Sequence, residues 1–163
     1  MDLKFQVQMK IQKSVEEVFD AVHSPDKLSG YFTNGGASAP LHEGTTVEWR
    51  FADNPGDEAI VAQVTVTKVI PNEVIVFEWQ GAKDHNTNVV MNFEKTGPEE
   101  TLVKISEIGW KENQQDLESS YGNCMGWSQM LSALKAFTEY GINLRKGAYK
   151  GLHKAEDFKS AEA

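Results

Sequence analysis

The sequence has little cysteine, no long hydrophobic run and fewer basic than acidic residues. Cys124 is the single cysteine, which excludes an internal disulfide framework and any metal site built from several cysteines. No apolar run approaches the ~20 residues that a membrane-spanning helix needs, and the opening segment MDLKFQVQMK alternates in polarity instead of forming a signal-peptide core. We therefore expect a cytoplasmic protein with no membrane partner.

The charge balance argues against a nucleic-acid partner. The chain carries 16 Lys and Arg against 24 Asp and Glu, a formal net charge of −8, and such a chain repels phosphate backbones. Its basic residues are scattered until a late cluster of Arg145, Lys146, Lys150 and Lys154. We interpret this cluster as an offset to the negative end of the preceding helix dipole.

The commonest catalytic and metal-binding motifs are missing from the sequence. It contains no phosphate-binding glycine loop, no GxSxG elbow and no HExxH motif. The four histidines, His23, His42, His85 and His153, are widely separated, and a histidine in such a setting is more often a surface residue than a ligand. We predict no metal and no cofactor.

Residues 116–141 form the longest stretch with helical periodicity. The apolar side chains fall on one stripe, which predicts an amphipathic helix lying on an apolar surface. The stripe comprises Cys124, Trp127, Met130, Leu131, Leu134 and Phe137. The first half of this face carries Ser120 and Asn123, which either satisfy backbone N–H groups near the helix start or leave a hollow. Gly122 and Gly126 each cost about 1 kcal/mol relative to Ala in a helix interior, so they indicate a close approach, a kink or a site.

The rest of the chain has the pattern of strands and short helices. Alternation over residues 3–11 predicts an opening strand, a capping box at Ser14 and Glu17 begins a helix that Pro25 stops, and a second short helix follows in residues 26–32. Strands joined by turns are then expected at 47–51, 59–70, 74–79, 89–93 and 102–110, with a short additional strand near 37–39.

The predicted fold class is α+β. Strands joined by short turns pair antiparallel, so we expect a curved sheet of six or seven strands wrapped around the long C-terminal helix, with two short helices after the first strand. No linker or repeat interrupts the pattern, and residues 1–163 are expected to form a single domain. A strongly twisted sheet with a helix on its concave side favours a cavity.

Several of these features occur together in one known superfamily. They are the capped helix with Val18, Phe19 and Val22, the Gly35-Gly36 step, the Val74 to Trp79 strand after a Pro-Asn turn, Thr101 leading into a strand that ends at Gly109-Trp110, and the final helix with Gly126-Trp127, Leu131, Leu134 and Lys135. This arrangement resembles the START-related (SRPBCC) ligand-binding superfamily, and is most similar to the group homologous to the C-terminal domain of the activator of the heat-shock protein 90 ATPase.

The resemblance covers nearly the whole chain to about Arg145 and leaves residues 146–163 as a tail. It implies a stand-alone member of bacterial type with the helix-grip fold. Members of the superfamily include lipid carriers, hormone receptors, polyketide cyclases and co-chaperone domains, so the resemblance implies the fold and not the function.

Strand alternation predicts which side chains face the interior. Val103 and Ile105 should point inward, which places Glu107 on the same face near the strand end. A carboxylate inside the trough would act as an acid, a base or a ligand anchor, but we favour a solvated position at the rim because buried acids are uncommon. Cys124 more often packs as a small hydrophobe than acts as a nucleophile.

The candidate ligand-binding residues form an aromatic and Met-rich wall. This wall suits a flat or hydrophobic ligand, and an ordinary core has the same composition. The residues are Trp49, Phe51, Phe77, Trp79, Met91, Phe93, Glu107, Ser120, Asn123, Cys124, Trp127 and Met130.

Three functions are open, in the following order. The first is a binding module that holds a small hydrophobic or aromatic molecule between the sheet and the final helix. The second is an enzyme of cyclase or hydrolase type with Glu107 and Tyr121 as acid–base groups. The third is an interaction module for a chaperone or another protein, and an exposed sheet edge would also allow a homodimer.

Overall fold

The computed structural model describes residues 1–54 and 56–152, and its elements follow the α+β order expected from the sequence. The strands are β1 (Phe5–Ile11), β2 (Gly36–Ala37), β3 (Thr46–Phe51), β4 (Ile60–Ile70), β5 (Val74–Trp79), β6 (Thr87–Gly97) and β7 (Glu100–Ile108). The helices are α1 (Val15–His23), α2 (Pro25–Leu28) and α3 (Gln114–Tyr140). His153, Lys154 and the rest of the predicted tail from 153 onward lie outside the described residues.

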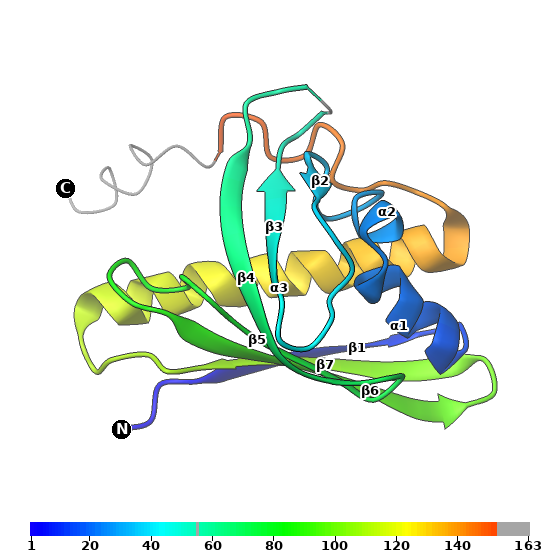
Figure 1. Cartoon of the computed structure of the whole chain (residues 1–163), viewed down its shortest axis with the longest axis horizontal. Coiled ribbons are helices and arrows are strands. Elements are labelled where there is room, and N and C mark those ends of the chain that lie inside the picture. Colours follow the sequence, from blue (N-terminus) through cyan, green and yellow to red (C-terminus); the bar gives the residue numbers. More distant parts are fainter. Residues whose placement is uncertain (55, 153–163) are drawn as a thin grey trace.

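The strands form one antiparallel sheet of seven in the order β1-β7-β6-β5-β4-β3-β2. Consecutive strands from β2 to β7 are neighbours, as short turns require, whereas β1 lies at the far edge beside β7. Figure 1 shows β3 and β4 turned strongly relative to β1 and β7, so that the sheet curls around α3. The expected curved sheet around a long C-terminal helix is confirmed.

Several boundaries differ from the sequence-based expectation; β7, for example, spans Glu100–Ile108 and not 102–110, and α2 ends at Leu28 and not at 32. β6 extends beyond 89–93 at both ends because its hydrogen-bonded register with β7 continues through Lys95 opposite Thr101. Pro25 ends α1 but also begins α2, since the fixed φ of proline suits the first helical position. The short strand expected near 37–39 lies at 36–37, where it pairs with Arg50 and Trp49 of β3.

Side-chain caps define where the two longer helices begin. The Ser14 side chain accepts a hydrogen bond from Glu17 N at 3.3 Å before α1, as the capping box predicts. Asn113 does the same for α3, accepting from Asp116 N at 2.8 Å. Gly141 ends α3 with φ 69°, a left-handed conformation that glycine adopts without steric cost. The chain therefore turns back sharply after α3.

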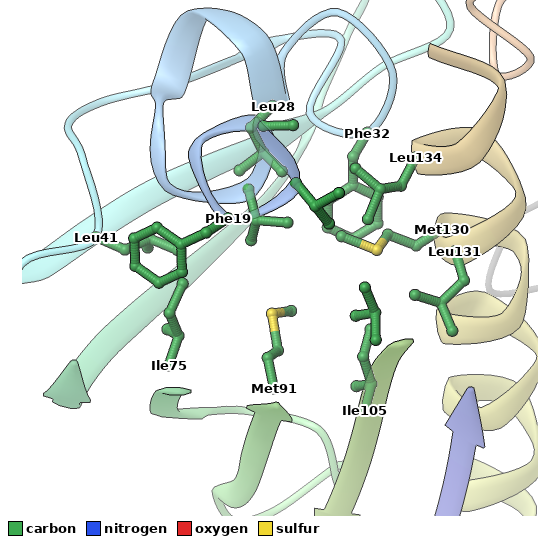
Figure 2. Packing of buried hydrophobic residues seen from close by; sticks show 14 of the residues in the cluster. Phe19, Leu28, Phe32, Leu41, Ile75, Met91, Ile105, Met130, Leu131 and Leu134 are labelled. Atoms are coloured by element: carbon green, nitrogen blue, oxygen red, sulfur yellow. The ribbon is translucent and has the colours of Figure 1, made fainter. Parts of the chain in front are cut away.

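The core lies between the concave face of the sheet, the two short helices and the second half of α3. Figure 2 shows Met91 and Ile105 rising from the sheet toward Met130, Leu131 and Leu134 of α3. Each of these five side chains is at most 2% exposed. Among residues 1–54 and 56–152, none of the helices combines the length and the hydrophobicity of a membrane-spanning segment.

Truncation of Leu131 to Ala should lower the free energy of unfolding by about 2–5 kcal/mol, because Leu131 is 1% exposed and its removal leaves a cavity. Met125→Ala is a matched control on the same helix, since Met125 is 53% exposed, and it should change stability by less than about 0.5 kcal/mol. Urea denaturation of both variants measures the difference. Equal losses in the two variants would contradict the assignment of the buried face of α3.

Candidate functional site

A groove of about 140 Å³, partly open to solvent, lies between the sheet and the first half of α3. Aromatic rings form much of its wall, and small or polar residues of α3 form another part. The lining residues are Phe32, Phe51, Trp79, Gly122, Asn123, Gly126, Trp127, Gln129 and Arg145. Its position agrees with the hollow that small and polar residues predict beside the first half of the helix.

The glycines of α3 face open space at this groove. A Cβ atom built at Gly122 or Gly126 would meet no other heavy atom within 4 Å, apart from the neighbouring helix backbone. The close-approach interpretation of these glycines is therefore wrong. Both line the groove, and a larger side chain at either position would extend into free volume.

Glu107 lies next to the groove and is completely buried. Its inward orientation from β7, in register with Val103 and Ile105, is confirmed, and its predicted solvated position at the rim is wrong because it has 0% exposure. Burial of a carboxylate is costly unless hydrogen bonds replace its hydration, and here side chains from three elements supply them.

Four side chains donate hydrogen bonds to the Glu107 carboxylate. Oε2 accepts from Trp79 Nε1 at 3.2 Å, Thr87 Oγ1 at 2.6 Å and Asn123 Nδ2 at 3.0 Å. Oε1 accepts from Trp127 Nε1 at 2.9 Å, and Asn123 Nδ2 is 3.3 Å away from it. The carboxylate thus joins β5, β6, β7 and α3 through groups that include three lining residues of the groove.

Gly81, in the loop between β5 and β6, allows this loop to lie against the carboxylate. A Cβ atom at this position would overlap Thr87 Oγ1 and Glu107 Oε2. The backbone of the loop therefore fills the space where a ligand would otherwise reach Glu107 from that side.

The structure separates the predicted binding residues into groups. Phe51, Trp79, Asn123 and Trp127 line the groove. Buried core positions, none more than 4% exposed, are occupied by Trp49, Phe77, Met91, Phe93 and Met130. The Ser120 hydroxyl donates to Leu117 O at 2.7 Å, so neither Ser120 nor Asn123 caps the helix start. Cys124 is half-buried, and Tyr121 is 64% exposed and makes no hydrogen bond to Glu107.

Besides Gly122 and Gly126, three lining residues were not among the candidate ligand-binding residues from the sequence: Phe32, Gln129 and Arg145. Phe32 precedes the Gly35-Gly36 step, and its ring packs against Trp127 with centroids 5.6 Å apart. Arg145 follows α3, where its charge indicated dipole compensation and not a site. A glycine directly after the last helical residue commonly ends a helix with a left-handed turn. Gly141 is therefore the sequence signal that could have predicted that the chain reverses and that the following residues pack back against the fold.

A second polar cluster ties the β5–β6 loop to the start of α3. His85 Nδ1 lies 2.7 Å from Asp84 Oδ1, and His85 Nε2 lies 3.0 Å from Gly109 O and 3.3 Å from the buried Asp116 Oδ2. Asp84, His85 and Asp116 are the one group of metal-ligand type found among the described residues. These three side chains pair with one another, and Lys111 lies 3.4 Å from Asp84. An ion-pair cluster therefore accounts for their proximity without a metal ion.

One known protein family matches most of the chain. Residues 12–139 match the model of the family described as Activator of Hsp90 ATPase homolog 1-like protein. The chain belongs to this family. The family assignment agrees with the resemblance that the sequence motifs indicate, and with the observed helix-grip fold. A search of curated proteins found no match.

Solved structures share this fold. Protein SSP2350 from Staphylococcus saprophyticus has a TM-score of 0.72 and 24% identity, covering 88% of this chain and 96% of that one. The Aha1 dimer from Colwellia psychrerythraea has a TM-score of 0.69 and 23% identity, covering 86% and 99%. An AHSA1-like protein from Aeromonas hydrophila has a TM-score of 0.69 and 18% identity, covering 85% and 94%. At these identities the similarity shows the fold alone.

Replacement of Glu107 by Gln should lower the free energy of unfolding by roughly 1.5–3 kcal/mol, because the amide has one acceptor oxygen and turns an N–H₂ group toward buried donors. Glu94→Gln on β6 is the matched control, since Glu94 is exposed and pairs with Lys104 at 3.5 Å on the surface. Urea denaturation followed by tryptophan fluorescence measures both. A Glu107→Gln variant as stable as wild type would contradict the structural importance of the carboxylate.

The His85 cluster should make stability depend on pH. The hydrogen bond to Asp84, followed by contributions from Gly109 O and Asp116, raises the pKa of His85. A raised folded-state pKa means that the stabilisation is fully present below the unfolded pKa of about 6.5 and is lost as pH rises through the folded pKa. The stability difference between wild type and His85→Gln should therefore shrink with rising pH.

Urea denaturation at about pH 5.5 and about pH 9 measures this difference. Asp84→Asn removes the largest cause of the shift, so in that background the pH dependence of the His85→Gln effect should be smaller. High salt should weaken the effect, because Asp84 is exposed. A difference that grows toward high pH would show that the sign of the coupling is wrong.

Proposed function

We propose that this chain is a binding protein that holds a small hydrophobic or aromatic molecule in the groove between the sheet and the first half of α3. The observation that carries the proposal is the groove itself, where aromatic rings face helix positions occupied by glycine. Pockets for small molecules are typically concave and apolar, with a few polar groups that set orientation.

The aromatic wall suits a flat ligand. The rings of Trp79 and Trp127 lie with centroids 5.2 Å apart, and the ring of Phe32 is 5.6 Å from Trp127 and 5.0 Å from Phe51. Tilted and edge-on contacts of this kind hold each ring in place. Trp127 and Phe32 are only 2% and 6% exposed, so a planar ligand would contact mainly the half-buried rings of Phe51 and Trp79, which the buried rings support.

The glycines support a binding role because they are unfavourable for the helix alone. Each of Gly122 and Gly126 destabilises a helix interior by roughly 0.5–1 kcal/mol relative to Ala, and an alanine methyl group would meet no obstacle at either position. The free volume that the two glycines leave for a ligand would explain why glycine occupies these positions despite the lost helix stability.

The volume of the groove limits the size of the ligand. A groove of about 140 Å³ is close to the ~150 Å³ of engineered cavities that accept benzene, and smaller than the ~300–1,000 Å³ of pockets for drug-sized molecules. A single ring fits. A larger molecule would place one ring in the groove and extend into solvent through the open side.

The two alternatives have less support from the geometry. Acid–base chemistry by Glu107 and Tyr121 would need the pair to meet a substrate, whereas Glu107 is enclosed by donors and Tyr121 is exposed. An interaction module or homodimer draws support from the similar Aha1 protein described as a dimer. The expected cytoplasmic location also stays a prediction.

Native mass spectrometry of the protein purified from its own host tests the proposal. A reproducible added mass that is lost on denaturation would identify a cargo. If the chain carries no added mass and a broad set of lipids, aromatics and polyketides also fails to stabilise it, the proposal is wrong. A ligand at 100 times its dissociation constant should add about 2.7 kcal/mol to the free energy of unfolding.

Gly126→Leu should block ligand binding without unfolding the protein. The leucine side chain would enter free volume in the groove and also favour the helix, so stability without ligand should be equal or higher. Ligand-induced thermal stabilisation should disappear. Ser128→Leu is the matched control, because Ser128 is exposed on the same helix and does not line the groove. Stabilisation that persists in Gly126→Leu would place the ligand elsewhere.

A further inference from the structure

The Arg145 guanidinium is the one charged group among the residues that line the groove. The chain has two arginines, and the other, Arg50, is exposed and forms an ion pair with Glu48 at 2.8 Å. Arg145 forms no ion pair with any carboxylate of the described residues. A positive charge beside an aromatic groove, in a chain with net charge −8, therefore lacks a counter-ion within the described fold.

The segment after α3 aims this side chain at the groove. Gly141 reverses the chain, and Asn143 Oδ1 accepts hydrogen bonds from Arg145 N at 3.0 Å and Lys146 N at 3.2 Å. Figure 1 shows the orange segment running back past α2 and β2. The position of Arg145 is thus set by a local turn and not by an ionic partner.

Three aromatic rings lie next to the Arg145 guanidinium. The central carbon lies 6.0 Å from the ring centroid of Phe32, 5.4 Å from that of Phe51 and 5.2 Å from that of Tyr149. A cation–π contact uses the positive charge of the guanidinium, whereas a carboxylate binds to its N–H groups, so the two interactions are compatible.

The donors of Arg145 are not all satisfied. Nε is buried and has no hydrogen-bond partner among the described residues. Burial lowers the pKa of Arg145, and electrostatic interactions with Tyr149 and then with Asp53 oppose this, although Asp53 forms no ion pair with it. A buried donor without a partner carries a desolvation penalty that a bound acceptor would remove.

We propose that the groove binds a monocyclic aromatic carboxylate, with the ring against Trp79 and Trp127 and the carboxylate on the edge of the Arg145 guanidinium. This proposal rests on the proposed function and adds the charge of the ligand to it. The volume admits one ring, and a single arginine matches one negative charge and a planar two-oxygen group.

Phenylacetate and its neutral analogue phenylacetamide are a suitable pair, because they share ring and length and differ in charge. Dissociation constants come from chemical-shift titrations with ¹⁵N-labelled protein, in which the indole N–H signals of Trp79 and Trp127 report binding in the groove. The wild-type protein should bind phenylacetate about tenfold more tightly than phenylacetamide, as one charge-assisted hydrogen-bonded pair supplies.

Arg145→Gln should abolish this preference and leave the affinity for phenylacetamide within about twofold. Arg145→Lys should retain part of the preference, because lysine keeps the charge without the planar fork. Arg50→Gln is the matched control and should behave as wild type, since Arg50 is already paired with Glu48.

Equal affinities for the two compounds in wild type, or a preference that survives Arg145→Gln, would overturn the carboxylate assignment and leave the proposed function intact. Failure of both compounds to shift the Trp79 and Trp127 signals would count against the groove as a binding site for single-ring molecules and overturn both. If Arg145→Gln does not fold, wild type decides alone: intermolecular nuclear Overhauser effects must place the phenylacetate ring protons at Trp79 and its methylene beside Arg145.

Discussion

The buried carboxylate of Glu107 joins three strands of the sheet to the first half of α3. Its oxygens accept hydrogen bonds from Trp79 of β5, Thr87 of β6, and Asn123 and Trp127 of α3. A buried charge with unsatisfied oxygens would be strongly unfavourable, so the carboxylate and its donors are stable only together. The first half of α3 is therefore held at the sheet by directional bonds.

The second half of α3 is held differently. Met130, Leu131 and Leu134 pack against the side chains of the sheet and the short helices, where close-packed contacts leave little free volume. Hydrogen bonds fix the distance between a helix and a sheet without filling the space beside them. The groove lies where hydrogen bonds to Glu107 replace close apolar packing as the attachment of α3, next to Gly122 and Gly126.

The sequence predicts the architecture well because alternation and helical periodicity are local. The inward orientation of Glu107 follows from its register with Val103 and Ile105, and this prediction is confirmed. Its burial could not be predicted in the same way, because its donors come from positions as distant as Trp79 and Trp127, and no local pattern shows that they converge. The position of Arg145 at the groove was missed because its charge was interpreted from the helix dipole alone and the reversal of the chain at Gly141 was not considered.

The two charged groups near the groove differ in how far they are satisfied, and this difference decides what a ligand meets. Glu107 is surrounded by N–H and O–H donors and is shielded from the groove by the residues that bind it. Arg145 is held by aromatic faces and keeps a buried donor without a partner. The Glu107 carboxylate is fully hydrogen-bonded, whereas the Arg145 guanidinium is not. The groove is therefore electrostatically suited to an anion, even though the chain as a whole is acidic.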